Sequence, residues 1–320
     1  MTLPILLDCD PGNDDALGIL VASGHRKLDL KAVTTGAGHL AGDRTARNAA
    51  ITLQLARKPA VPVAAGNTGP LVRERLIAGV LDMESALDPV RDDLPARALD
   101  ARHSVDIIID TVKSRFASTI VTTGPQTNIA MALRRAPEIA AMIERIVILG
   151  GSWGLGNKTA AAEWNILCDP EAAAIVFDAG VPITMLPIDS LIQVGISPDL
   201  IARTRAIGGQ IGRFSAELLD SLVSTFRPGV MAPPFMPLND PVASLVAAEP
   251  GLVETAAARV EVELAGRHTY GRTVVDFAMR NGKPANAEVV IRFDREGVEN
   301  AFVGALDRLA KSQNRSGVPS

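Results

Sequence analysis

Residues 4–15, Pro-Ile-Leu-Leu-Asp-Cys-Asp-Pro-Gly-Asn-Asp-Asp, form an apolar run that ends in an acidic loop. The run at residues 4–7 predicts a buried strand, because successive apolar side chains suit a sheet that is covered on both faces. The loop places four carboxylates within eight residues, at positions 8, 10, 14 and 15. In an open α/β sheet, ligands bind beyond the carboxyl ends of the strands. This stretch therefore predicts an α/β fold with a polar site at one edge of its sheet.

Short apolar runs alternate with helical patterns along the first part of the chain. After residues 4–7, further strands are predicted at residues 30–33, 119–122, 145–149 and 181–186. The segment Asp169-Pro170-Glu171 predicts a helix start, because it combines an N-cap, a proline in the first turn and an early acid. Strands that alternate with helices indicate βαβ units. We therefore expect an α/β fold with an open, mainly parallel, Rossmann-like sheet and helices on both faces.

The second half of the chain adds helices and a small late β segment to that core. Helices are predicted near residues 198–206, 210–225, 241–248 and 294–310, and strands at 259–265 and 289–293. Residues 227–237 contain four prolines and a glycine, which exclude a helix or a central strand and favour a lid over a site. No internal repeat is visible. We expect a single domain over residues 1–312 and a polar tail at 313–320.

The composition excludes several classes of protein. The 320 residues include 36 acidic and 32 basic side chains, for a formal net charge of −4, and no basic stripe is present, so we expect no nucleic-acid partner. No apolar run approaches the roughly 18 residues that span a bilayer. The N-terminus shows no secretion signal. Two cysteines exclude a disulfide scaffold and a four-cysteine zinc site. We therefore expect a cytoplasmic protein that contacts no membrane.

The acidic loop at residues 8–15 predicts a metal site. Carboxylates so close together repel one another unless a cation neutralises them, and no lysine or arginine lies near them in the sequence. Ligands that are all oxygen atoms favour Ca²⁺ or Mg²⁺. The alternative is that Asp14 or Asp15 only caps the following helix. An aspartate that attacks a phosphoryl group is a weaker alternative, because residues 11–13 lack the hydroxyl and lysine that this chemistry needs.

Several segments, all in the same order, carry a resemblance to a known family. Residues 8–16 look like the N-terminal signature of the inosine–uridine-preferring nucleoside hydrolases. The later segments that resemble this family are Val33-Thr34-Thr35-Gly36-Ala37-Gly38, Arg47-Asn48-Ala49, Thr123-Gly124-Pro125-Gln126-Thr127-Asn128-Ile129-Ala130, Gly150-Gly151, Gly156-Asn157, Ala162-Glu163-Trp164-Asn165, Asp169-Pro170-Glu171-Ala172-Ala173, Asp240-Pro241 and Thr273-Val274-Val275-Asp276.

The resemblance implies a calcium-dependent enzyme that hydrolyses the N-glycosidic bond of ribonucleosides to free base and ribose. Ca²⁺ would be held by the side chains of Asp10, Asp15 and Asp240 and by the backbone carbonyl of Thr123. Asp10 would also be the general base that activates a calcium-bound water. The residues expected to hold the ribose hydroxyls are Asp14, Asn157, Glu163, Asn165 and Asp240. The family also implies a homodimer or homotetramer.

The residue types suit this reaction, although each also has a plainer interpretation. Cleavage of an N-glycosidic bond passes through a ribosyl cation, which carboxylates and amide oxygens stabilise. Asp169 and Asp276 are expected to be structural, as a cap and as a turn or strand residue. The plainer interpretations of the other residues are a turn for Asn157, an ordinary strand or loop for Glu163 and Asn165, and a helix cap for Asp240. Trp153 is a candidate for binding the substrate by stacking on the base, but it can equally pack in a lid, and the same holds for Phe235.

Two positions depart from the family pattern. His39 stands where many members have asparagine, and Asn239 stands where the inosine–uridine-preferring members have the histidine that protonates the leaving base. An asparagine can donate a hydrogen bond but is no acid near neutral pH. His39 is a candidate for that role, because its reference pKa is near 6.5. It can equally be a neutral loop histidine. Asn239 and His39 therefore join Asp10 as catalytic candidates.

The missing histidine leaves the substrate open. The leaving base can instead be protonated by solvent or activated by stacking, and we predict a weak preference for purine nucleosides. One alternative is hydrolysis of another N-ribosyl compound. A second is a non-catalytic protein that binds ribose or nucleosides.

Overall fold

The computed structural model describes residues 2–76, 87, 97–227 and 235–315. The strands are β1 (Leu3–Cys9), β2 (Leu28–Thr35), β3 (Val63–Ala65), β4 (Thr119–Thr122), β5 (Arg145–Leu149), β6 (Ile183–Leu186), β7 (Val253–Val262), β8 (Thr273–Asp276) and β9 (Ala287–Phe293). The helices are α1 (Asn13–Gly24), α2 (Gly42–Leu55), α4 (Ser104–Lys113), α5 (Thr127–Arg135), α6 (Trp164–Cys168), α7 (Pro170–Phe177), α8 (Ile188–Leu191), α9 (Pro198–Ala206), α10 (Gly209–Thr225), α11 (Asp240–Ala248) and α12 (Arg295–Arg315). Two 3-10 helices are η2 (Pro137–Met142) and η3 (Pro250–Leu252).

The strands form one sheet in the order β3-β2-β1-β4-β5-β6-β9-β7-β8. Neighbouring strands are parallel from β3 to β9, whereas β7 runs antiparallel to both β9 and β8. This confirms the mainly parallel α/β sheet and the late β segment. The strand order reverses between β1 and β4, and open α/β sheets bind their ligands at such a reversal.

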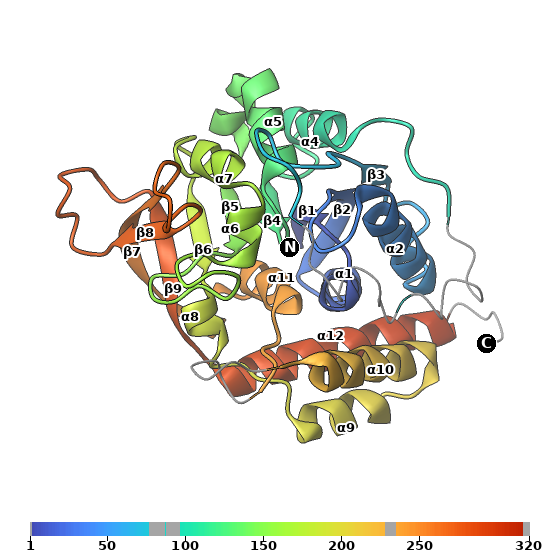
Figure 1. The fold of residues 1–320 in the computed structure, drawn as a ribbon. Coiled ribbons are helices and arrows are strands. Elements are labelled where there is room, and N and C mark those ends of the chain that lie inside the picture. The colour runs from blue at the N-terminus through green and yellow to red at the C-terminus, as the bar shows by residue number, and fades with distance from the viewer. Residues whose placement is uncertain (1, 77–86, 88–96, 228–234, 316–320) are drawn as a thin grey trace.

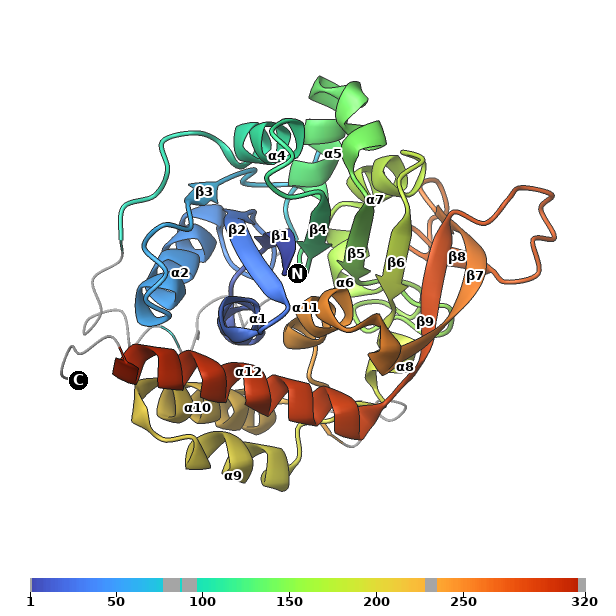
Figure 2. The same cartoon turned by 180° about the vertical axis from the view of Figure 1, so that it is seen from behind.

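Helices cover both faces of the sheet (Figures 1 and 2). Ile5 and Leu7 of β1 pack into one core with α1, α2, α10, α11 and α12, whereas Leu6 packs into a second core with α4, α5 and α7. The alternation follows from the strand itself, since successive side chains point to opposite faces. α10 and α12 both contact α1, and α9 packs beside them as an outer layer.

The predicted elements recur, with the largest change in β7, which spans Val253–Val262 instead of 259–265. The strands β4 and β5 have the predicted bounds, whereas β3, β8, α4, α6 and α8 are not evident from the sequence pattern. The terminal helix ends at Arg315 instead of near residue 310. Gln313 explains the extension, because its side chain is buried and its Nε2 donates to the Leu55 carbonyl (2.8 Å). The division into one domain and a tail stays a prediction, and residues 316–320 lie outside the described residues.

The proline-rich segment is described only at its ends. Residues 228–234 of the expected lid lie outside the described residues. Phe235 packs against Gly195, where an added Cβ would lie 2.3 Å from the phenyl ring. The backbone N–H of Leu238 donates to Val194 (2.8 Å) and so leads the chain into α11. Within the described ranges, no helix has the length and apolar character needed to cross a membrane.

The contact between α1 and α12 depends on a residue without a side chain. Gly24 is the last residue of α1, and an added Cβ would lie 2.2 Å from the Ala305 carbonyl oxygen of α12. The same added Cβ would lie 2.9 Å from Leu309 Cβ. The close approach of these two helices therefore requires glycine at this position.

We expect Gly24→Ala to lower the free energy of unfolding by about 1–3 kcal/mol, since the added methyl group overpacks the helix contact. The same change at Gly304 of α12 should raise it by about 0.5–1 kcal/mol, because alanine favours a helix and nothing lies within 4 Å of the new Cβ. Urea denaturation measures both variants. A Gly24→Ala protein as stable as the wild type would contradict this packing.

Candidate active site

The loops predicted to carry the chemistry meet at the carboxyl edge of the sheet. β1, β2, β4 and β5 all end there (Figure 1). Asp10 follows β1, His39 comes after β2 and Thr123 follows β4. The backbone N–H of Thr123 donates to the Asp8 carbonyl (3.0 Å), which ties the ends of β4 and β1 together. Segments more than 100 residues apart in sequence therefore contribute to one site.

Three carboxylates form the centre of the site. Within the described residues, Asp14, Asp15 and Asp240 each offer one oxygen atom, and these atoms all lie within 4.8 Å of one another. Asp14 and Asp15 lie in the first turn of α1, and Asp240 is the first residue of α11. Asp15 and Asp240 are buried, whereas Asp14 is half-buried. The structure thus places together three of the acidic residues predicted for metal and ribose binding, and Asp10 and Glu163 are not part of this group.

These carboxylates are under electrostatic strain. Burial raises the pKa of Asp15 and of Asp240 well above the ordinary range, and the charges of the neighbouring aspartates raise it further. A hydrogen bond from the Thr123 hydroxyl to Asp15 Oδ1 (2.6 Å) opposes the shift. A hard cation would neutralise the cluster, and the oxygen atoms present are the ligands that Ca²⁺ and Mg²⁺ prefer.

Asp10 lies beside this group but faces a different set of partners. It is buried, and its Oδ2 accepts a hydrogen bond from the backbone N–H of His39 (2.8 Å). Two glycines allow the loops to reach it, because an added Cβ would lie 2.0 Å from Asp10 Oδ2 at Gly38 and 2.4 Å from Oδ1 at Gly124. The carboxylate of Asp10 is therefore held in one orientation between two loops.

His39 bridges Asp10 and an aromatic wall. Its Nδ1 lies 3.4 Å from Asp10 Oδ2, and 38% of its side chain is exposed. The imidazole stacks on Trp164, with ring centroids 4.3 Å apart and planes inclined by 20°. Burial alone would lower the pKa of His39, but its hydrogen bond to Asp10 and the negative charges around it raise that pKa above 6.5. His39 is thus better placed to carry a proton than an isolated loop histidine.

Glu163 is the N-cap of the short helix α6. Its side chain accepts hydrogen bonds from the backbone N–H groups of Gly151 (2.8 Å), Asn165 (2.9 Å) and Ile166 (3.2 Å). Burial raises the pKa of Glu163, although these donors and the charge of His39 act in the opposite direction. The carboxylate is therefore oriented by the backbone and contributes a further acidic group to the site.

Asn165 joins the central loop to the metal candidates. Its Nδ2 donates to the carbonyls of Thr123 (2.8 Å) and Leu149 (3.0 Å). The Thr123 carbonyl, predicted as a metal ligand, thus lies within reach of a residue predicted to hold ribose. This contact links the ends of β4 and β5.

Asn157 and Trp153 lie farther out in the loop between β5 and α6. Asn157 is exposed, and its Oδ1 accepts a hydrogen bond from the Trp164 backbone N–H (2.9 Å). The Trp153 ring meets Phe277 edge to face at a centroid distance of 5.8 Å. Asp189 holds this loop through the N–H groups of Trp153 and Gly154 (both 2.9 Å). Asn157 and Trp153, both predicted to bind the substrate, therefore make contacts within the protein, to the Trp164 backbone and to the Phe277 ring.

The residue before Asp240 does not act as a helix cap through its side chain. Asn239 occupies the N-cap position of α11, is half-buried, and makes no capping hydrogen bond there.

Two residues expected to be structural do behave as expected. Asp169 caps α7 through the Ala172 N–H (3.0 Å), and Asp276 accepts from the turn that follows β8.

Sequence reasoning placed Asp8 in the acidic loop but missed its pairing with Asn128, which lies behind the site. Asp8 and Asn128 are 2% and 1% exposed, and Asn128 Nδ2 donates to Asp8 Oδ1 (2.9 Å). Burial raises the pKa of Asp8 to about 7, against the hydrogen bonds from Thr34 and Asn128. A charged residue that ends an apolar strand was the available signal for Asp8. The partner of Asp8 is 120 residues away in sequence and becomes visible only in the fold.

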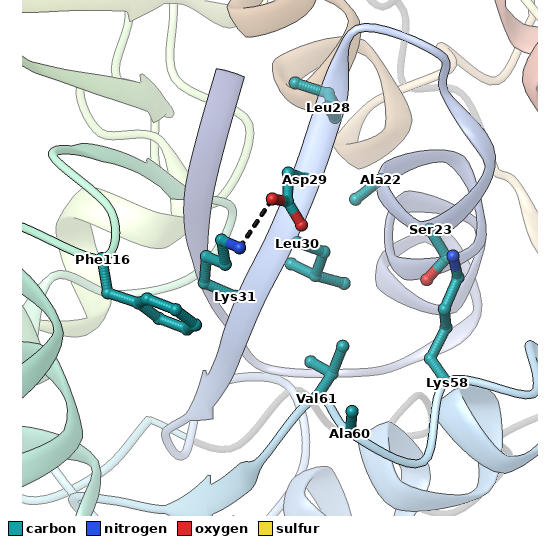
Figure 3. A pocket seen from close by; sticks show the side chains of 10 residues that line it. All are labelled: Ala22, Ser23, Leu28, Asp29, Leu30, Lys31, Lys58, Ala60, Val61 and Phe116. Carbon is teal, nitrogen blue, oxygen red and sulfur yellow. Dashed lines mark ion pairs between the residues drawn. The ribbon is translucent and has the colours of Figure 1, made fainter. Parts of the chain in front are cut away.

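A cavity of about 230 Å³ lies at the opposite edge of the sheet (Figure 3). Its lining includes Ser23, Phe116 and the ion pair between Lys31 and Asp29 (2.6 Å). β2 begins at this cavity and ends at the acidic cluster. The cavity is therefore separate from the candidate active site.

The chain is similar to known ribonucleoside hydrolases over nearly its whole length. A family model described as inosine-uridine preferring nucleoside hydrolase matches residues 5–300. The pyrimidine-specific ribonucleoside hydrolase RihA of Salmonella agona is 41% identical over 311 residues, which cover 97% of this chain and 100% of the relative. RihA of Escherichia coli O139:H28 is 42% identical over 311 residues, covering 97% and 99%.

Solved structures show the same fold. A purine-preferring ribonucleoside hydrolase from Gardnerella vaginalis superimposes with a TM-score of 0.86 at 31% identity, covering 97% of this chain and 99% of that one. The plant nucleoside hydrolase PpNRh1 gives a TM-score of 0.86 at 28% identity, with coverage of 96% and 99%. Together with the matched family model and the acidic site, these similarities show that the chain belongs to the inosine-uridine preferring nucleoside hydrolase family.

Proposed function

We propose that this protein hydrolyses ribonucleosides to a free base and ribose, with Ca²⁺ held in the acidic cluster. The observation that carries the proposal is the convergence of Asp14, Asp15 and Asp240 beside Asp10 at the strand reversal. Buried like charges need a cation, and Ca²⁺ prefers ligand sets made of oxygen atoms. The names of the related proteins support the same reaction.

The proposed ligands are the side chains of Asp10, Asp15 and Asp240 and the carbonyl of Thr123. Thr123 fits this role, since its hydroxyl donates to Asp15 and so holds its backbone beside that carboxylate. Asp14 belongs to the same group of oxygens and is proposed to bind a ribose hydroxyl. When bound, the cation would lower the pKa of the attacking water and add positive charge next to the ribose diol.

Asp10 is proposed to accept the proton of the attacking water. A base that is already oriented does not have to be ordered during the reaction, and Asp10 is held by the His39 N–H and by its close contacts with two loops. The surrounding carboxylates, Glu163 among them, favour the ribosyl cation that develops as the glycosidic bond breaks. Asn157, Asn165 and Asp240 complete the proposed ribose contacts.

His39 is the proposed proton donor to the leaving base. Its ring is partly exposed, contacts Asp10 and is held flat against Trp164. Asn239 has no capping bond, so its amide is free of that role and is proposed to donate a hydrogen bond to the base. The edge-to-face contact with Phe277 favours lid packing for Trp153 over base stacking.

The sequence departures and the similar proteins point to different preferred bases. The absence of a histidine before Asp240 predicts a weak preference for purines, which the similar proteins do not confirm. The curated relatives at 41–42% identity are named pyrimidine-specific, which favours uridine and cytidine. The purine-preferring neighbour is less similar, at 31% identity. We therefore place pyrimidine ribonucleosides first. The homodimer or homotetramer and the cytoplasmic location also stay predictions.

We expect purified protein to release reducing sugar from uridine and cytidine in the presence of Ca²⁺. A chelator should reduce the rate at least about tenfold and lower the melting temperature, because the ion stabilises only the folded state. Adding Ca²⁺ back should restore both. Inosine, adenosine and guanosine, assayed in parallel, give the ranking of bases.

The ranking and the controls separate the alternatives. Purines ahead of pyrimidines would overturn the base preference that we propose and favour the argument from Asn239. Thermal stabilisation by nucleosides without any product would indicate a binding protein. Turnover of other N-ribosyl compounds, without turnover of any ribonucleoside, would show that ribonucleosides are not the substrates.

We expect Asp10→Asn to lower kcat by about 10²–10⁴-fold, as removal of a general base does, while KM changes by no more than about threefold at saturating Ca²⁺. Asp169→Asn is a matched control, because Asp169 is a fully buried aspartate that caps α7. It should lose stability without a selective loss of kcat. Calorimetric titration with Ca²⁺ shows whether each variant still binds metal. Equal losses of kcat and Ca²⁺ affinity in Asp10→Asn would indicate a ligand and not a base.

We expect His39→Gln to lower kcat on uridine by about 10²-fold, because the departing base then lacks its acid. On p-nitrophenyl riboside the loss should stay below about threefold, since p-nitrophenolate leaves without protonation. Steady-state kinetics on both substrates give the comparison. Equal losses on the two substrates would assign His39 a structural role instead.

A further inference from the structure

Asn128 is a buried amide whose hydrogen bonds are all made. It lies in the first turn of α5 and is 1% exposed. Its Nδ2 donates to Asp8 Oδ1 (2.9 Å) and to the Thr35 carbonyl (3.0 Å). Its Oδ1 accepts from the backbone N–H (3.0 Å) and from Nδ2 (2.9 Å) of Asn67. One side chain therefore joins the carboxyl ends of β1 and β2 to the loop that follows β3.

The bonds continue from Asn67 to the active-site loop. The Asn67 carbonyl accepts the N–H of Ala37 (2.9 Å), and two residues later the N–H of His39 donates to Asp10 Oδ2 (2.8 Å). The N–H of Gly36 donates to the Cys9 carbonyl (3.1 Å), which fixes the start of this loop against β1. A short chain of hydrogen bonds thus connects Asn128 with Asp10.

The backbone around Asn128 is shaped for this amide. At Gly66, an added Cβ would lie 2.3 Å from Asn128 Oδ1 and 2.5 Å from the Thr35 carbonyl oxygen. Asp8, the other partner, also accepts from the Thr34 hydroxyl (2.6 Å) and is 2% exposed. Buried polar groups stay stable only when their hydrogen bonds are complete, so the loss of one member disturbs the whole junction.

We propose that Asn128 is a positioning residue, which sets the loop of residues 36–39 so that His39 stays in contact with Asp10. The inference rests on the proposed role of Asp10 as the base. Asn128 itself does not contact the reacting atoms in this arrangement. It acts through Asn67 and Ala37 on the loop, and through Asp8 on β1, which leads directly into Asp10.

Hydrogen exchange tests the positioning directly and needs no turnover. In Asn128→Ala, the amides of Ala37 and His39 should exchange at least about tenfold faster than in the wild type, because their acceptors are no longer held in place. Asn286→Ala is the matched control. Asn286 makes three side-chain hydrogen bonds at the distant β7, to Phe177 and Val260. Unchanged exchange at residues 37–39 in Asn128→Ala would overturn the proposal.

Kinetics test whether the positioning matters for the reaction. Asn128→Ala should lower kcat about tenfold or more with KM within about threefold, whereas Asn286→Ala should lose stability and keep its kcat. Should Asn128→Ala fail to fold, Asn67→Ala removes a half-buried partner of the same junction and should show the same split. Equal kcat losses in the Asn286 and Asn128 variants would overturn the proposal.

A reversal of the central hydrogen bond gives a test of rescue. Asn128→Asp places two carboxylates against each other and should lower kcat further than Asn128→Ala. Combining it with Asp8→Asn restores a donor and an acceptor in the opposite sense, so the double variant should recover at least about fivefold in kcat over Asn128→Asp. A double variant no faster than Asn128→Asp would overturn the role of this bond.

The outcomes distinguish this proposal from the proposed function. If Asp10→Asn retains its kcat, the role of Asp10 fails even when exchange at residues 37–39 responds to Asn128. If exchange does not respond while Asp10→Asn is inactive, the proposed base stands and the positioning role of Asn128 fails.

Discussion

The burial of several carboxylates at one point is the constraint on which the rest of the structure depends. Asp10, Asp15 and Asp240 are all less than 5% exposed. Buried charges of the same sign destabilise a fold unless hydrogen-bond donors or a cation compensate them. The protein supplies the Thr123 hydroxyl, the His39 backbone N–H and the N-terminal end of α1, where negative charge is favoured. The remaining charge is what a bound cation would neutralise.

Topology brings the required groups to that point. The strand order reverses between β1 and β4, so the loops after these strands diverge and leave room for a site between them. Gly38 and Gly124 then let both loops approach the Asp10 carboxylate more closely than any side chain would permit. The Asp10 carboxylate is thus oriented by backbone geometry, and little depends on long flexible side chains.

Both departures from the family pattern lie next to buried aspartates of the site. His39 lies where it contacts Asp10 and stacks on Trp164, and Asn239 precedes the buried Asp240. The carboxylates proposed to bind the ribose match the family pattern, whereas His39 and Asn239, which are proposed to contact the leaving base, depart from it. We therefore expect this chain to differ from other family members in how it binds and protonates the base, and to resemble them in how it binds the ribose.

The sequence alone determined the α/β class, the bounds of β4 and β5, and the acidic pair Asp14 and Asp15, because hydrophobic periodicity and local motifs act over a few neighbouring positions. The third member of the cluster, Asp240, was expected only from the resemblance to the family. It did not show the three-residue strand β3, which is too short for a periodic pattern, or the last turn of α12, which is held by Gln313 against Leu55. Only the tertiary structure decided that Asn128 joins Asp8 to Asn67, and that Trp153 packs on Phe277. These contacts join residues 61–124 positions apart, and no local pattern records which distant partner the fold will bring within hydrogen-bond or ring-contact distance.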